Sequence, residues 1–495
     1  MRLWQLTLGG SLLSGLLLVL LFPPFDLRWL APVALTPLLY ALAHEPFGKS
    51  RFLWGWLSGF VFWISVCWWI QYTLLHYGGL NLPLSILALV LFAAVKALHL
   101  GVFGLLAGPM LERPWGLLAI PALWAGLERT HAPLGFTWLQ LGNAGIDMML
   151  PLRLAPVTGV YGVSFVFAAL ACGLTFMLLR YPRRQLVWLA PLAVLVVLPA
   201  VGYREAPKAV AVSMQPVLTD TVRYTPESLE REIRSQAFAT LGEALRPDRE
   251  KPSLLLWPEV PAPFYYYADA KFREAVTDTA RLSGAGFVLG TVAFTTRSEP
   301  LNSAVFLASD GRLAGRYDKV HLVPFGEFVP PLFGWINKIS SEAGDYQAGE
   351  RIVVFPLDGH AAGAFICYES AFPDHVRQFV DQGAQVLLNL TNDGYFGRSA
   401  AREQHLLLAR MRAVENKRWV LRSTNDGITA AVDPAGIVRD RMKPDVRMAG
   451  RMRFGWLSEK TPYTQYGDWF AWLCLAAGLA GAAVRMRQER AGQIP

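Results

Sequence analysis

The segment GAFICYES (residues 363–370) leads an apolar stretch directly into a cysteine, a tyrosine, a carboxylate and a serine. Two interpretations fit this pattern. Cys367 is either a small hydrophobic residue at the end of a buried strand, as most free cysteines are, or a nucleophile held at the tip of that strand. The segment alone favours the first interpretation, so the choice depends on the rest of the chain.

The composition indicates a membrane protein. The 495 residues are 53% apolar, 12% aromatic and 17% charged, which is too apolar for an ordinary soluble protein of several domains. The four cysteines lie far apart, so neither a disulfide framework nor a paired zinc site is expected. The net charge of +8 accompanies arginines beside apolar runs, which favours a topology signal over a nucleic-acid partner.

Long apolar runs predict about eight membrane-spanning helices. Seven of them lie in a first region, residues 1–203, and one lies in a last region, residues 467–495. The predicted spans are 3–22, 28–43, 52–75, 82–111, 114–128, 158–179, 185–203 and 468–486. The intervening residues 204–466 form a separate domain.

Basic residues in the short loops predict the orientation of these spans. GKSR (48–51), RYPRR (180–184) and RMRQER (485–490) fall on the same side if every span crosses the membrane. Loops rich in Lys and Arg stay in the cytoplasm. We therefore expect the domain 204–466 to lie outside the cytoplasmic membrane.

Within this domain the pattern changes to short strands and amphipathic helices. Apolar stretches such as 209–214, 253–259 and 385–390 predict strands, and 227–245 and 401–417 predict helices. Asp-Gly pairs at 310–311 and 358–359 are typical of hairpin turns. Alternating strands and helices with inserted hairpins predict an α/β layered sandwich.

Three ionisable residues follow apolar strands of this domain: Glu259 in LLLWPEV, Lys319 in GRYDKVHLVPFGEF and Cys367 in AFICYES. Strand ends can converge at one edge of a sheet although they are distant in sequence. A carboxylate could accept the thiol proton, and an ammonium could stabilise the oxyanion formed by attack on a carbonyl. Each residue alone is more often a surface charge or a core residue, so the hypothesis depends on the combination.

The order Glu, Lys, Cys, at intervals of 60 and 48 residues, resembles the carbon-nitrogen hydrolase (nitrilase) superfamily, whose members carry this triad on an αββα sandwich. Further segments resemble the apolipoprotein N-acyltransferase family, the membrane-bound branch of that superfamily. They are DKVHLVPFGEFVP (318–330), CYES (367–370), NLTNDGYFG (389–397), MRAVENKRWVLRSTNDG (411–427) and TPYTQYGDW (461–469). That family also places a nitrilase-like domain between a multi-span region and one last span.

The resemblance implies that Glu259 is the general base, Lys319 the oxyanion stabiliser and Cys367 the nucleophile. Because the N–H of Tyr368 directly follows the nucleophile, it is a candidate second oxyanion donor. Supporting or substrate-binding roles are implied for Glu327, Tyr368, Glu369 and Tyr224.

Two positions depart from the pattern of many relatives, which have Trp where this chain has Tyr224 and Tyr395. The aromatic face is kept, but the indole donor is lost. Aromatic stretches at 261–267 and 331–339 are either lids over an acyl pocket or ordinary loop packing, and the sequence favours neither.

The implied reaction moves an acyl chain from a glycerophospholipid to the α-amine of a diacylglyceryl-cysteine on an apolipoprotein, through a thioester on Cys367. It needs no cofactor. The location implied is the bacterial cytoplasmic membrane, in contact with membrane lipids. Nothing in the sequence indicates an obligate partner, so we expect a monomer.

Other functions are considered beside this one. A membrane-tethered amidase or nitrilase would use the same triad on a small C–N substrate. A transporter or receptor would bury ionisable groups within its spans, but the apolar runs contain few, chiefly Lys96, His99 and Glu128. His321, near Lys319, suggests a Cys-His pair, although Glu259 already offers a base. No metal or nucleotide motif occurs.

Overall fold

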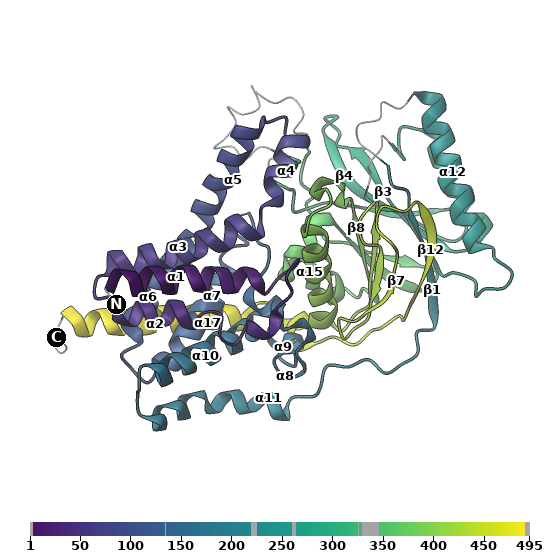
Figure 1. Ribbon diagram of the computed structural model, residues 1–495. Coiled ribbons are helices and arrows are strands. Elements are labelled where there is room, and N and C mark those ends of the chain that lie inside the picture. Colours follow the sequence, from purple (N-terminus) through teal and green to yellow (C-terminus); the bar gives the residue numbers. More distant parts are fainter. Residues whose placement is uncertain are drawn as a thin grey trace. The chain divides into compact units, whose positions relative to one another are not determined.

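The computed structural model describes residues 3–133, 135–218, 225–259, 264–324, 326–328 and 346–490 (Figure 1). The chain divides into two compact units. The helical unit comprises residues 1–75, 80–201 and 466–495, and the α/β unit comprises residues 76–79 and 202–465. The segment 76–79 thus belongs to the α/β unit, although its neighbours in the sequence belong to the helical unit.

The helical unit consists of apolar helices joined by short connections. Its longer helices are α1 (Leu3–Leu20), α2 (Thr36–His44), α3 (Gly48–Val66), α4 (Trp69–His76), α5 (Leu82–Lys96), α6 (Leu98–Met110), α7 (Gly116–Arg129), α10 (Val160–Leu178) and α17 (Trp469–Arg490). The shorter segments are η1 (Arg28–Leu30), η2 (Leu141–Asp147), α8 (Met149–Leu152), α9 (Ala155–Thr158), η3 (Arg183–Ala193) and α11 (Val194–Val197).

Several of these helices are long and apolar enough to cross a membrane. Among the described residues they are 3–20, 82–110, 160–178 and 469–488, and a fifth span results if α3 and α4, bent by 53°, act as one. Three predicted spans contain shorter elements: α2 has nine residues, α7 has 14, and η3 leads into the four-residue α11. The number of eight spans stays a prediction.

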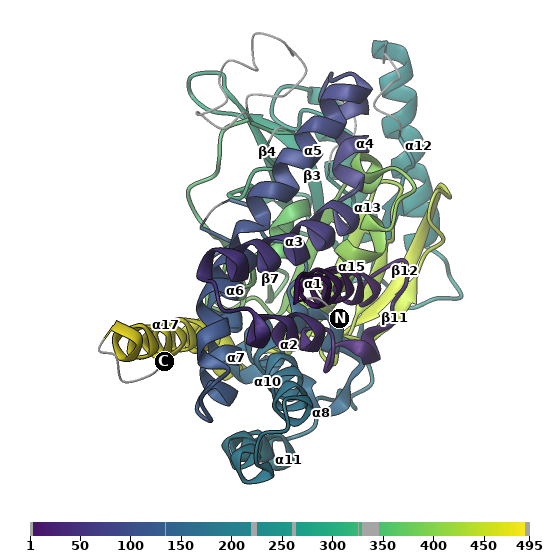
Figure 2. The same ribbon diagram turned by 60° about the vertical axis from the view of Figure 1, so that its left-hand side comes forward.

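Glycines allow a close helix contact in this unit, between α7 and α17 (Figure 2). A Cβ atom on Gly126 would lie 2.4 Å from the Cα of Leu475, and one on Gly478 would lie 2.5 Å from the Cα of Leu123. Small residues let two apolar helices approach until their backbones touch, which gives dispersion contacts that larger side chains would prevent. These glycines therefore hold the last helix against α7.

The α/β unit is built on two six-stranded sheets. The first has the order β12-β1-β2-β3-β4-β5 and the second β11-β10-β9-β8-β7-β6. Strands of the first sheet are β1 (Ala209–Gln215), β2 (Leu254–Leu256), β3 (Gly286–Phe294), β4 (Pro300–Leu307), β5 (Leu313–Asp318) and β12 (Met448–Phe454). Those of the second are β6 (Val354–Leu357), β7 (His360–Ile366), β8 (Val386–Thr391), β9 (Val420–Thr424), β10 (Ala430–Val432) and β11 (Val438–Arg441).

Helices cover the outer face of each sheet, and this confirms the predicted α/β sandwich. The first sheet carries α12 (Pro226–Ala244) and α13 (Ala270–Ser283), and the second carries α14 (Pro373–Asp381) and α15 (Ala401–Asn416). Figure 1 shows α12 and α15 on opposite sides of the paired sheets. One short helix, α16 (Pro462–Tyr466), ends the unit.

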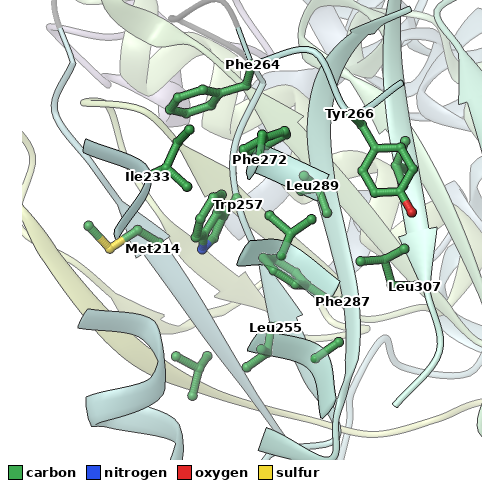
Figure 3. Close-up of a cluster of buried hydrophobic side chains, with 14 of the residues drawn as sticks. Met214, Ile233, Leu255, Trp257, Phe264, Tyr266, Phe272, Phe287, Leu289 and Leu307 are labelled. Carbon is green, nitrogen blue, oxygen red and sulfur yellow. The ribbon is translucent and has the colours of Figure 1, made fainter. Parts of the chain in front are cut away.

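Alternation along the strands sorts side chains between the two faces of the first sheet. Met214, Leu255, Trp257, Phe287 and Leu289 point to the helix side, where they form one buried cluster with residues of α12 and α13 (Figure 3). Residues between them point to the other sheet; the hydroxyl of Ser213, for example, donates to that of Ser423 at 2.8 Å. Period-two patterning thus gives each strand two buried faces.

The edge strand β12 was not predicted from the sequence. It pairs antiparallel with β1, so that Ala209 lies opposite Phe454. The strands β1, β2 and β3 are parallel, as are β7, β8 and β9. Carboxyl ends of parallel strands share one edge of their sheet, where side chains from distant segments can meet.

Candidate active site

Two carboxylates and one ammonium form a buried cluster at the ends of β2 and β5. Glu259 lies three residues after β2, and Lys319 directly follows β5. The Lys319 Nζ lies 3.2 Å from Oε1 of Glu259 and 2.8 Å from Oε1 of Glu327. Burial alone would lower the pKa of Lys319, but the two carboxylates outweigh it and raise that pKa well above its ordinary value. The lysine is therefore a fixed positive charge.

Amide groups orient both carboxylates. The Nδ2 of Asn302 donates to Oε1 of Glu259 and to Oε1 of Glu327, each at 2.7 Å. The backbone N–H of Asn392 donates to Oε2 of Glu259, and that of Val323 to Oε2 of Glu327, each at 2.8 Å. Each carboxylate thus accepts hydrogen bonds on both oxygens, which limits its rotation.

Cys367 occupies a strained turn at the end of β7. It begins the short helix η6 (Cys367–Ala371), is buried, and has a φ of +49°. A residue other than glycine adopts this left-handed conformation only where its surroundings hold it. The charges of Glu259 and Lys319 both act on the thiol of Cys367.

Burial raises the pKa of the Cys367 thiol above its ordinary value, and the charge of Glu259 raises it further. The ammonium of Lys319 and a hydrogen bond with Thr391 oppose this rise without cancelling it. The thiol is therefore protonated at neutral pH. A nucleophile in this state needs a base beside it at the moment of attack.

Glu259 has the properties of such a base. Burial raises the pKa of its carboxyl above the ordinary value, while Lys319 lowers it. A carboxylate with a raised pKa accepts a proton more readily than a solvated one. The arrangement can therefore pass the thiol proton to Glu259 and hold a developing oxyanion beside Lys319.

Glu369 joins the segment carrying Lys319 to the segment carrying Cys367. Its Oε1 accepts from the N–H groups of Val320 and His321 at 2.7 and 3.1 Å, and its Oε2 from the N–H of Ile366 at 2.7 Å. Burial would raise the pKa of Glu369, but His375 and hydrogen bonds from the N–H of Ile366 and the hydroxyl of Tyr317 lower it to about 2. This carboxylate stays ionised and acts as a scaffold.

The structure shows the surroundings of most of the remaining predicted residues. Tyr368 is buried and packs edge-on against Phe372, with ring centroids 5.1 Å apart. Tyr224 lies outside the described residues. Tyr395 packs against Tyr77, with ring centroids 4.7 Å apart. His321 stacks on Phe372, and burial with the neighbouring His375 lowers the pKa of His321 to about 4.

The stretches considered as lids are only partly described. The second, 331–339, lies outside the described residues, as do 261–263 of the first. Phe264 and Tyr266 are each 4% exposed and belong to the core cluster of Figure 3. Their positions agree with ordinary loop packing for this part.

Three residues near the cluster were missed from the sequence: Asn302, Thr391 and Tyr346. Burial and the charges of Glu327 and Glu259 raise the pKa of Tyr346 to about 12. Thr391 lies in the quoted motif NLTNDGYFG, which was the available signal. Asn302 lies within a strand and gave none. Within the described ranges, no group of three or more His, Cys, Asp or Glu is placed to hold a metal ion.

Family models match both parts of the chain. One describes the apolipoprotein N-acyltransferase N-terminal domain and matches residues 14–173; the other describes carbon-nitrogen hydrolases and matches residues 225–444. An amidase from Nesterenkonia sp. of known structure is 20% identical, covers 52% of this chain and 93% of its own, and superposes with a TM-score of 0.38. The two family models place the chain in the class of proteins that join an apolipoprotein N-acyltransferase N-terminal domain to a carbon-nitrogen hydrolase domain.

Relatives matched over the full length define the family. The apolipoprotein N-acyltransferase of Geobacter metallireducens is 34% identical over 97% of this chain and 95% of its own. That of Methylococcus capsulatus is 32% identical over 97% of this chain and 96% of its own. The chain belongs to the apolipoprotein N-acyltransferase family, which confirms the resemblance found in the sequence.

Proposed function

We propose that this enzyme transfers an acyl chain from a glycerophospholipid to the α-amine of a diacylglyceryl-cysteine at the N-terminus of an apolipoprotein. The names of its full-length relatives support N-acylation of lipoproteins. One observation carries the assignment of the chemistry: Lys319 bridges Glu259 and Glu327, and the charges of Glu259 and Lys319 both act on the thiol of Cys367.

In the first half-reaction, Glu259 takes the thiol proton while the sulfur of Cys367 attacks the ester carbonyl carbon of the phospholipid. Lys319 and the backbone N–H of Tyr368 stabilise the oxyanion. The C–O bond then breaks, and Glu259 returns its proton to the departing oxygen. A lysophospholipid leaves, and the acyl group remains on Cys367 as a thioester.

In the second half-reaction, the α-amine of the lipoprotein attacks the thioester carbonyl. Glu259 accepts a proton from the attacking nitrogen and returns one to the departing sulfur. The products are an amide and the free thiol, so atoms and charges balance without a cofactor. Transfer to an amine rather than to water requires a positioned acceptor and a dry site.

Glu327 and Glu369 have supporting roles in this proposal. Glu327 holds the ammonium of Lys319 at 2.8 Å and shares the amide of Asn302 with Glu259. Glu369 keeps the segments of Lys319 and Cys367 in register through backbone N–H groups. Neither carboxylate exchanges a proton during turnover.

Association with the membrane follows from the substrates. Each methylene of an acyl chain that leaves the bilayer costs about 0.8 kcal/mol, so the enzyme acts where the lipid is. We propose eight spans in the regions 1–203 and 467–495, with the domain 204–466 on the outer side of the bacterial cytoplasmic membrane. We further propose that the enzyme is a monomer.

The test uses purified enzyme in detergent with radiolabelled phospholipid and a diacylglyceryl lipopeptide. The wild type should produce labelled triacyl lipopeptide, and Cys367→Ser should produce none while still inserting into membranes. Unimpaired transfer by Cys367→Ser would refute the assignment. An amidase, which the full-length relatives do not favour, would instead release ammonia from small amides and leave the lipopeptide unlabelled.

A further inference from the structure

A second cluster of charged and titratable side chains contacts the backbone of Cys367. Asp393 begins the short helix η7 (Asp393–Phe396) after β8, His405 lies in α15, and Arg422 lies in β9. All three side chains are fully buried. The mechanism described above uses none of them, although burying so many polar groups is costly unless they have a purpose or mutual partners.

His405 holds the carbonyl group of the nucleophile. Its Nε2 lies 2.9 Å from the backbone oxygen of Cys367. A carbonyl oxygen only accepts hydrogen bonds, so this contact requires the proton of the imidazole to be on Nε2. The other ring nitrogen, Nδ1, lies 3.0 Å from Nη2 of Arg422 and 3.1 Å from Oδ1 of Asp393.

Arg422 and Asp393 select this tautomer. Burial and the charge of Arg422 lower the pKa of His405; Asp393 and the hydrogen bond to Cys367 oppose this without cancelling it, so the ring is neutral at pH 7. With its single proton on Nε2, the ring accepts from Arg422 at Nδ1. The same guanidinium nitrogen is fixed by Asp393, whose two oxygens lie 2.6 and 2.7 Å away. The imidazole is thereby set to donate to Cys367.

The carbonyl of Cys367 and the N–H of Tyr368 belong to one rigid peptide group. In a trans peptide these two bonds point in opposite directions. A hydrogen bond that fixes the carbonyl therefore fixes the direction of the N–H on the other side. The conformation of Cys367, with φ of +49°, costs about 1–2 kcal/mol without such support.

The segment that carries Asp393 also contacts Glu259, the proposed base. Asn392, which precedes Asp393, donates its backbone N–H to Oε2 of Glu259 at 2.8 Å. Asp393 also accepts from the hydroxyl of Thr391 at 3.2 Å, and Thr391 hydrogen bonds with the thiol. One buried cluster thus holds the turn of the nucleophile and the strand end that orients the carboxylate.

We propose that His405 is a positioning residue that aims the peptide group between Cys367 and Tyr368, so that the N–H of Tyr368 faces the oxyanion of the acyl-transfer intermediate. This inference rests on the proposed function, in which Cys367 is the nucleophile. Asp393 and Arg422 act through His405 by fixing its tautomer and its orientation.

The test compares two neutral replacements of similar size. In His405→Gln an amide nitrogen can occupy the position of Nε2 and donate to Cys367. In His405→Asn the amide reaches only the position of Nδ1, so the donor to Cys367 is lost. We expect His405→Asn to lower kcat of acyl transfer about 100-fold with little change in KM, and His405→Gln to stay within about 5-fold of the wild type.

A second readout separates oxyanion stabilisation from general damage to the site. Alkylation of Cys367 by iodoacetamide forms no oxyanion, whereas acylation by phospholipid does. In His405→Asn the acylation rate should fall about 100-fold, while the alkylation rate, followed by mass spectrometry of the Cys367 peptide, stays within about 3-fold. Parallel losses of both rates, or equal transfer by the two variants, would overturn the inference.

Folding and the underlying mechanism are controlled separately. The thermal midpoint of each variant in detergent shows whether it is folded. If His405→Asn is not folded, the test uses His405→Gln alone, whose ratio of acylation rate to alkylation rate should stay within about 5-fold of the wild-type ratio. A lower ratio would overturn the inference. Normal transfer by Cys367→Ser would instead show that the proposed function itself is wrong.

Discussion

The two units of this enzyme accommodate buried ionisable groups in different ways. In the helical unit they have a neutral partner, as Lys96 has in the carbonyl of Phe136, or form a single ion pair, as Arg129 does with Asp468 and Arg485 with Glu112. In the α/β unit several of them meet in one place: Lys319 contacts two carboxylates, and Arg422 contacts both Asp393 and His405.

The difference supports the proposed location of the chemistry. Transferring a charge into the protein interior costs several kcal/mol, and neutral partners or a single opposite charge recover only part of it. A concentration of coupled charges in one place is therefore more informative about function than about stability. The clusters at the ends of β2, β5, β7 and β8 are such concentrations of coupled charges. The contact of α7 with α17, in contrast, involves glycines and backbone atoms and serves packing.

The largest expected effect tests whether the coupled charges have distinct roles. Glu259→Gln should lower the rate of acyl transfer about 1,000-fold because the base is lost, whereas Glu327→Gln should lower it only about 10-fold because Lys319 keeps one partner. The measurement is kcat with labelled phospholipid and lipopeptide. Equal losses would mean that the two carboxylates share one role.

The next effect concerns the scaffold carboxylate. Holding the pKa of Glu369 at about 2 instead of the ordinary 4.5 corresponds to about 3 kcal/mol of folding stability. Because the folded-state pKa is depressed, this contribution is complete above about pH 4.5 and is lost as the pH falls toward 2. Glu369→Gln should lower the thermal midpoint at pH 7 and should flatten its decline in that window. An unchanged pH dependence would contradict the assignment.

A smaller effect is expected in the helical unit. Gly478→Ala places a Cβ atom 2.5 Å from the backbone of Leu123, so α7 and α17 must separate, at a cost of about 2 kcal/mol. Gly9→Ala is the matched control, since nothing lies within 4 Å of the new atom. Thermal unfolding in detergent should distinguish them, and equal midpoints would show that close packing is unimportant here.

The smallest effect should come from an exposed ion pair of the α/β unit. Arg441 and Glu403 lie 2.5 Å apart with side chains 43% and 44% exposed. Pairs of this kind contribute about 0–1 kcal/mol because solvent screens them. Glu403→Gln should therefore shift the thermal midpoint hardly at all, in contrast to Glu369→Gln. A comparable shift of the midpoint would mean that burial does not explain the difference in stability contributed by Glu369 and Glu403.

Much of the α/β unit could be predicted from the sequence because its strands are short, apolar and followed by turn residues. Glu259, Lys319 and Cys367 were selected as candidate site residues because each follows such a strand. Asn302 was missed since a polar residue within a strand usually marks its solvent face. His405 was missed for a similar reason, because one polar residue on a helix does not indicate which backbone group it contacts.

The membrane helices were harder to delimit. An apolar run sets the length available for a span but not the residue at which a helix begins. Residues 28–43 illustrate this: Pro32 and Pro37 lie within the run, and the structure places the three-residue η1 and the nine-residue α2 there. Proline is tolerated in the first turn of a helix and disrupts its interior, so composition alone overestimated the helical length.

The most direct test of the central claim is mass spectrometry of the enzyme after incubation with phospholipid in the absence of a lipoprotein acceptor. The account predicts that the Cys367 peptide gains the mass of one acyl chain, and that a diacylglyceryl lipopeptide then removes it and becomes triacylated. Continued formation of triacyl lipopeptide without any adduct on Cys367 would contradict the account.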